Sequence, residues 1–212
     1  MKKHSILIIF LLIFSSIFCQ NQDSNIEYFD DDGKKITKNE YVEKIKSRLF
    51  TTIVTDTTKN VYLVKRIQAG EITNKKIFDS LIKKEFAKKY DPNLPTVIVY
   101  YPGKDNCNSA NNGSNWNPIK NRYYNELEKG LRKRGKYNIF YVYKSKKGLK
   151  DGNKGYKKWH SDPENIFEKL FFRYHYPCNS YVIIKPNGKY ISILGESGKE
   201  TVWKMYDNID VL

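Results

Sequence analysis

TVIVYYPG, the segment at residues 96–103, decides the fold of this chain. Its first six residues are β-branched or aromatic with no polar alternation, which is typical of a strand buried on both faces inside a sheet. The step Pro102-Gly103 ends that strand, because proline cannot donate to a sheet and glycine favours turns. A second run of the same kind, YVII at residues 181–184, predicts another central strand.

Helical patterns alternate with these strands. Asn117-Pro118 is a good helix start, and Ser161 to Glu164 reads as a capping box that opens a helix with Ile166, Phe167, Leu170 and Phe171 on its buried face. The tetrapeptide PNGK at residues 186–189 predicts a tight hairpin. The order expected from residue 74 onward is helix 74–90, strand 96–101, helix 118–134, strand 137–143, a helix opening at 161, strand 181–185, strand 190–194 and helix 199–209.

The preceding region, residues 20–73, is predicted to be β-rich. An Asp-Gly step within residues 30–33 predicts a hairpin between 26–29 and 35–36, and β-type runs follow at 51–55 and 61–67. Thr37 and Glu40 have the spacing of a capping box that opens a short helix through Lys46. No repeat or low-complexity linker separates this region from residues 74–212, so we expect the two parts to pack together.

Residues 1–19 have the pattern of an export signal: a short basic start followed by an apolar core from Ser5 to Phe18. Cleavage before Gln20 would release the remainder, whereas lipid attachment at Cys19 would tether it to a membrane. The segment is short for a membrane span, and no other stretch of the chain is a candidate for one. We therefore expect an exported protein, periplasmic, secreted or anchored through Cys19, in a compartment where disulfides persist.

The composition is globular and strongly basic, with a formal net charge of +15 at pH 7. The excess is lysine, scattered in pairs, while arginine, the better residue for bidentate phosphate recognition, is scarce. This distribution favours a solvated surface with at most weak contact to an anionic polymer, and no specific nucleic-acid partner is predicted.

Two cysteines remain beyond the export signal. Cys107 follows the predicted strand 96–101 by a short loop, and Cys178 lies directly after Pro177 at the entrance to strand 181–185. An exported domain with two cysteines favours their pairing.

From residue 74 onward the chain resembles the thioredoxin-like superfamily. The resemblance rests on element order, on a cysteine in the loop after the first central strand (YPGKDNC, 101–107), on a proline before the third strand (YPC, 176–178), and on the strand–turn–strand segment YVIIKPNGKY (181–190). It implies a central mixed sheet flanked by helices, with residues 20–73 as a β-rich extension. It also implies that Pro177 is cis and lies opposite the Cys107 loop, close to which Cys178 would then be found.

The active-site pattern of that superfamily is degenerate here. Its oxidoreductases carry Cys-x-x-Cys at a helix N-terminus, which stabilises the attacking thiolate. The corresponding stretch is CNSA, so Ala110 occupies the resolving position, and the predicted helix start at Pro118 is too far along the chain to serve Cys107. The spacing required of a peroxidase cysteine after Pro102 is also missing.

Three interpretations of Cys107 and Cys178 remain open: a structural disulfide, a non-adjacent redox pair in which Cys107 attacks and Cys178 resolves with help from His175, or two free thiols. His160, His175 and the cysteines match no zinc-ligand spacing, so no metal and no cofactor is predicted. We expect an accessory or binding module of the cell envelope, with an unidentified protein or envelope partner, in which Cys107–Cys178 is structural. The alternative is a thiol–disulfide oxidoreductase that uses Cys107 and Cys178 as its catalytic pair.

Overall fold

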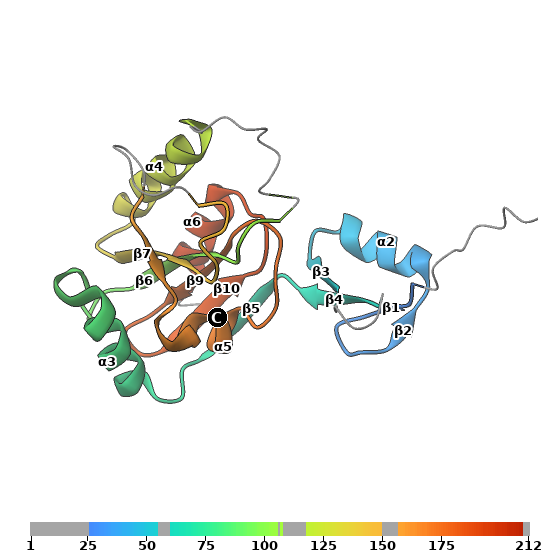
Figure 1. Ribbon diagram of the computed structural model, residues 1–212, viewed down its shortest axis with the longest axis horizontal. Coiled ribbons are helices and arrows are strands. Elements are labelled where there is room, and N and C mark those ends of the chain that lie inside the picture. The colour runs from blue at the N-terminus through green and yellow to red at the C-terminus, as the bar shows by residue number, and fades with distance from the viewer. Residues whose placement is uncertain (1–25, 55–59, 106, 108–117, 150–156, 210–212) are drawn as a thin grey trace, which may run out of the picture.

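Residues 26–54, 60–105, 107, 118–149 and 157–209 are described by a computed structural model of the chain. Within these ranges it is an α/β protein with two mixed sheets, of four and six strands, and five α-helices (Figure 1). No helix in the described ranges is long and apolar enough to cross a membrane. The predicted export signal at residues 1–19 lies outside the described residues.

The smaller sheet is built by the N-terminal region. Its strand order is β2-β1-β4-β3, from β1 (Tyr28–Phe29), β2 (Lys35–Ile36), β3 (Phe50–Val54) and β4 (Val61–Lys65). The predicted hairpin is confirmed: the Gly33 N–H donates to the Asp30 carbonyl at 3.0 Å, and β1 pairs antiparallel with β2. Helix α2 (Lys38–Lys46) opens with the predicted capping box, in which Thr37 and Glu40 each accept a hydrogen bond from the other's backbone N–H.

The larger sheet is made of six strands in the order β5-β10-β9-β6-β7-β8. Strands β6 and β7 are parallel, as are β7 and β8, whereas β9 runs antiparallel to β6, and β10 antiparallel to both β9 and β5. The strands are β5 (Ile67–Glu71), β6 (Thr96–Tyr101), β7 (Asn138–Tyr143), β8 (Trp159–Ser161), β9 (Ser180–Ile184) and β10 (Lys189–Ile193).

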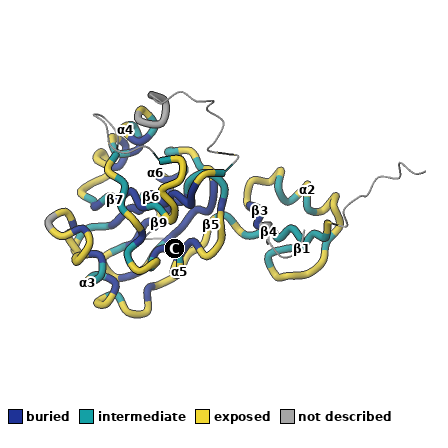
Figure 2. The backbone as a smooth tube through the Cα atoms, viewed as in Figure 1, coloured by how far each residue is buried: buried dark blue, intermediate teal, exposed yellow. Residues whose placement is uncertain are grey.

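Helices cover both faces of this sheet, with a hydrophobic core between the helices and the sheet on each side. Alternate residues of β6 point into the two cores. Val97 and Val99 pack with α4 (Pro118–Arg132) and α6 (Lys199–Asn208). Ile98 and Tyr100 pack on the opposite face with α3 (Lys75–Phe86) and α5 (Ile166–Phe171). Every residue of β6 and β9 is buried, as expected for central strands (Figure 2).

Two strands and one helix start differ from the sequence expectation. Strands β5 and β8 were not predicted. Every residue of β5 is exposed, so its sequence lacks the apolar alternation of a half-buried strand, and β8, with three residues, is too short to show a pattern. The predicted capping box at Ser161 is wrong, because a 3-10 turn at Pro163–Asn165 precedes α5. The Asp162 carboxylate instead accepts the N–H groups of Phe167 and Glu168, at 3.0 and 2.8 Å. Leu170, expected in the core, is 40% exposed.

Candidate functional site

Cys107 and Cys178 meet at one end of the central strands of the large sheet. Cys107 follows β6 and Cys178 precedes β9, its direct neighbour in the sheet. Because these strands are antiparallel, the segment after β6 and the segment before β9 emerge at the same end. The Cys107 and Cys178 Cα atoms are 5.3 Å apart and the sulfur atoms are joined as a disulfide that closes 71 residues of chain. This is the pairing expected from the sequence.

Asp105 ties together the same two segments by polar contacts. Its Oδ2 oxygen accepts a hydrogen bond from the Cys178 backbone N–H at 3.0 Å and lies 3.1 Å from the His175 Nε2 atom. Its carboxylate is also within 4.8 Å of both sulfur atoms. The loop after β6 is therefore held to the entrance of β9 by a covalent bond and by a carboxylate two residues from Cys107.

Glu196 approaches the disulfide from a third segment, the loop between β10 and α6. Its Oε2 oxygen lies 3.8 Å from the Cys107 sulfur. Sequence reasoning identified neither Glu196 nor Asp105 as part of the site. Glu196 gives no local signal, because it stands 89 positions from Cys107 in the chain.

The electrostatics at the sulfurs oppose thiolate formation. A negative charge close to a thiol disfavours its ionised form, and the thiolate is the nucleophile in disulfide exchange. Asp105 and Glu196 both place carboxylates near the sulfurs. The helix that follows Cys107 in the chain, α4, begins at Pro118. Cys107 therefore does not stand in the first turn of that helix, the position of the attacking cysteine in thioredoxin-like enzymes.

Pro177 corrects one implication of the family resemblance. We expected a cis peptide bond before it, but none of the described peptide bonds is cis. Pro177 is trans and stands directly before Cys178, which has a left-handed backbone with φ of +65°. A non-glycine residue in this region carries strain. The disulfide and the Asp105 contact to its N–H hold Cys178 in this conformation.

The two histidines lie in different places. His175 contacts Asp105 near the disulfide, whereas His160 lies on β8, its ring centroid 4.9 Å from that of Phe86. Burial, together with Lys158, lowers the pKa of His160. A zinc site built on Cys107 and Cys178 would require both as thiolates, whereas their sulfur atoms are joined to each other.

Some of the lysines are paired with carboxylates within the protein. Among the described residues, the lysines within 4.0 Å of a carboxylate oxygen include Lys35, Lys44, Lys46, Lys65, Lys75, Lys144, Lys157 and Lys199. They are spread over the small sheet, over helices α2, α3 and α6, and over the segments next to β7 and β8. This pattern is that of a solvated surface with dispersed ion pairs, each of which contributes little.

The fold and this site define an α/β protein with two mixed sheets and a disulfide flanked by carboxylates. In comparisons with known proteins, no protein-family model, no curated protein and no solved structure matches the chain.

Proposed function

We propose that this protein is an exported accessory or binding module of the cell envelope, built on a thioredoxin-like fold whose redox site has become structural. Four strands of the large sheet support the fold: their order is β10-β9-β6-β7, with β6 and β7 parallel and the other pairs antiparallel. Strand order and direction of this kind, with helices on both faces, agree with the resemblance seen in the sequence.

The observation that carries the proposal is the position of Asp105. One carboxylate binds the Cys178 backbone and contacts His175, while it lies within 4.8 Å of both sulfur atoms. The Asp105 carboxylate therefore stabilises the disulfide-bonded state through its polar contacts. Its negative charge also disfavours the thiolate that forms when the disulfide is reduced. Closing about 70 residues of chain stabilises a domain by roughly 4 kcal/mol in the chain-entropy model.

Thiol–disulfide exchange is the second candidate function, and one observation favours it. Cys107 is at least partly exposed to solvent, which attack by an incoming thiol requires. In that function Cys107 would receive the attack, Cys178 would leave as the thiolate, and electrons would come from a partner dithiol.

A Cys107→Ser variant of the exported chain separates the two functions, compared with a Cys107→Ser/Cys178→Ser double variant. A structural disulfide predicts that the wild-type protein neither reduces nor oxidises a model disulfide substrate above background, and that both variants melt at lower temperature. Exchange activity in the wild type, lost in both variants, would reject the structural role and establish the oxidoreductase.

A further inference from the structure

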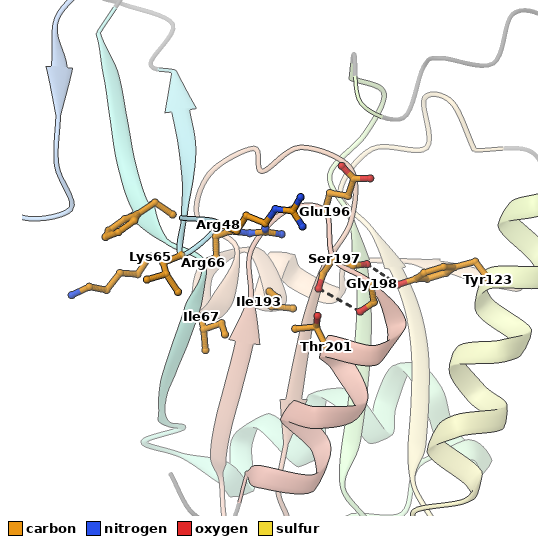
Figure 3. A pocket seen from close by; sticks show the side chains of 12 residues that line it. Arg48, Lys65, Arg66, Ile67, Tyr123, Ile193, Glu196, Ser197, Gly198 and Thr201 are labelled. Carbon is orange, nitrogen blue, oxygen red and sulfur yellow. Dashed lines mark hydrogen bonds between the residues drawn. The ribbon is translucent and has the colours of Figure 1, made fainter. Parts of the chain in front are cut away.

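A pocket of about 930 Å³ lies where the small sheet meets the large one (Figure 3). One of its lining residues, Glu196, also contacts the Cys107 sulfur. One wall comes from the segments 48–50 and 65–67, at the ends of β3 and β4, and the opposite wall from Glu196 to Thr201 at the start of α6. Ile193 of β10 and Tyr123 of α4 complete the lining. This volume is in the range of pockets that hold small ligands.

Arg66 is fixed at the junction of the two sheets. Its backbone N–H donates to the Leu49 carbonyl and its carbonyl accepts from the Leu194 N–H, both at 2.8 Å. The Arg66 Nε group donates to the Leu194 carbonyl at 3.2 Å, so the guanidinium is held in place before any ligand arrives. Burial lowers the pKa of Arg66, which nevertheless stays protonated at neutral pH.

Arg48 joins Arg66 at the pocket. Figure 3 shows both side chains extending from the β3–β4 side toward Glu196, and the positive charge of Arg48 opposes that of Arg66. Among the described residues, no carboxylate oxygen lies within 4.0 Å of either guanidinium. Three other arginines do have such partners: Arg122 with Glu126, Arg132 with Glu128 and Arg134 with Asp207.

The charges of the lining favour a single negative charge on the ligand. Glu196 is the acidic residue of the lining, and Lys65 is paired with Asp31 at 3.0 Å. The two guanidiniums and the one carboxylate therefore leave one net positive charge. A guanidinium binds a planar carboxylate through two parallel hydrogen bonds, which suits this arrangement.

The rest of the ligand is expected to be apolar. Leu49 is 65% exposed and Ile67 is 48% exposed, although both are large hydrophobic residues that line the pocket. Phe50 and the buried Ile193 lie alongside them. Covering such side chains with an apolar group is favourable, because it removes their surface from water.

We propose that this pocket binds a carboxylate attached to an apolar group, with Arg48 and Arg66 as the carboxylate-binding residues. The carboxylate belongs either to a free hydrophobic acid or to the C-terminus of a peptide that ends in an apolar residue. The inference extends the proposed binding role. No cysteine lines the pocket, so carboxylate binding can be measured separately from the state of the disulfide, although Glu196 contacts both.

Calorimetric titration of the exported chain tests the assignment with four probes: hexanoate, N-acetyl-Leu-Phe with a free carboxylate, the same peptide as its amide, and inorganic phosphate. We expect at least one of the two carboxylates to bind, and the amide and phosphate to bind at least about tenfold more weakly. Binding of hexanoate identifies a free acid as sufficient, whereas binding of the peptide acid alone identifies a peptide C-terminus.

Matched variants complete the test. Arg48→Gln and Arg66→Lys should each weaken carboxylate binding by about tenfold or more, while Arg132→Gln, on α4 and paired with Glu128, should leave it unchanged. Arg48 is exposed, so its variant is expected to keep the melting temperature of the wild type. The inference is overturned if neither carboxylate binds, if acid and amide bind equally, or if Arg48→Gln and Arg132→Gln behave alike. Each of these results would leave the structural role of the disulfide standing.

Discussion

The Oδ2 oxygen of Asp105 accepts a hydrogen bond from the backbone N–H of Cys178 at 3.0 Å. The disulfide joins the same two segments through Cys107, two residues further along the chain. The loop after β6 is therefore fixed to the entrance of β9 at two points. The polar contact brings a negative charge to the sulfurs, which makes the site a poor environment for thiolate chemistry.

Asp105→Asn should speed the reduction of the disulfide by glutathione. The substitution removes the negative charge and preserves the shape of the side chain. The attacking glutathione thiolate is repelled by the Asp105 carboxylate, so removing that charge should speed reduction by about fivefold at low salt. The rate of thiol appearance, followed by alkylation and mass, measures this. Glu43→Gln, an exposed charge change on α2, is the control and should leave the rate unchanged. Equal rates for wild type and Asp105→Asn would show that the carboxylate does not protect the disulfide.

Gly130→Ala should destabilise the protein although alanine is the better helix former. A Cβ atom at Gly130 would lie 2.1 Å from the ring of Trp203, whose Nε1 group donates to the Leu127 carbonyl at 3.0 Å. The ring would have to move away from α4, which should lower the free energy of unfolding by roughly 2 kcal/mol in urea denaturation.

The same substitution in a Trp203→Ala background provides the control. With the ring removed, Gly130→Ala should stabilise the helix by about 1 kcal/mol, the ordinary difference in helix propensity. If the substitution destabilised both backgrounds by the same amount, contact with Trp203 would not be the cause.

Asp162 should give the protein a stability that depends on pH between about 4 and 6. Burial raises the pKa of Asp162 from its ordinary value of 3.8 to about 6, against the opposing effect of the N–H groups of Phe167 and Glu168. The folded state then holds a proton that the unfolded state releases. Stability from this group is complete below pH 4 and is lost as the pH rises through 6, by roughly 2 kcal/mol.

Asp162→Asn isolates that contribution, because asparagine keeps one acceptor oxygen without titrating. The free energy of unfolding of wild type and variant is measured by urea denaturation from pH 4 to pH 7. As the pH rises, the wild type should lose stability relative to the variant. Taking the difference removes the effect of His160, whose lowered pKa acts in the opposite direction. A difference that stays constant over this range would contradict the assignment.

Local signals explain which parts of the fold could be predicted. Strand β6 follows from its unbroken apolar run, and the α2 capping box from the spacing of Thr37 and Glu40, since both patterns are complete within a few residues. Strand β5 could not be found this way: it is exposed and exists because it pairs with β10, about 120 residues later. The start of α5 was misplaced because Asp162 caps it from five residues away.

The candidate site was predictable only in part for the same reason. The pairing of Cys107 with Cys178 was expected from the export signal and the family resemblance. Glu196 and the pocket arginines come from segments that meet only in the folded chain, so their spacing in the sequence does not predict that they lie together. The peptide bond before Pro177 was also not predicted correctly: it is trans, and the residue after it, Cys178, has a positive φ and is held by the disulfide.

The central claim is that the Cys107–Cys178 disulfide is structural, and its reduction potential tests this most directly. The purified protein without residues 1–19, the predicted export signal, is equilibrated in glutathione buffers of known potential, and its free thiols are counted by alkylation and mass. The account predicts a disulfide that remains closed down to about −300 mV, as structural disulfides do. Reduction at about −200 mV or higher, in the range of exchange catalysts, would contradict it and make the protein an oxidoreductase.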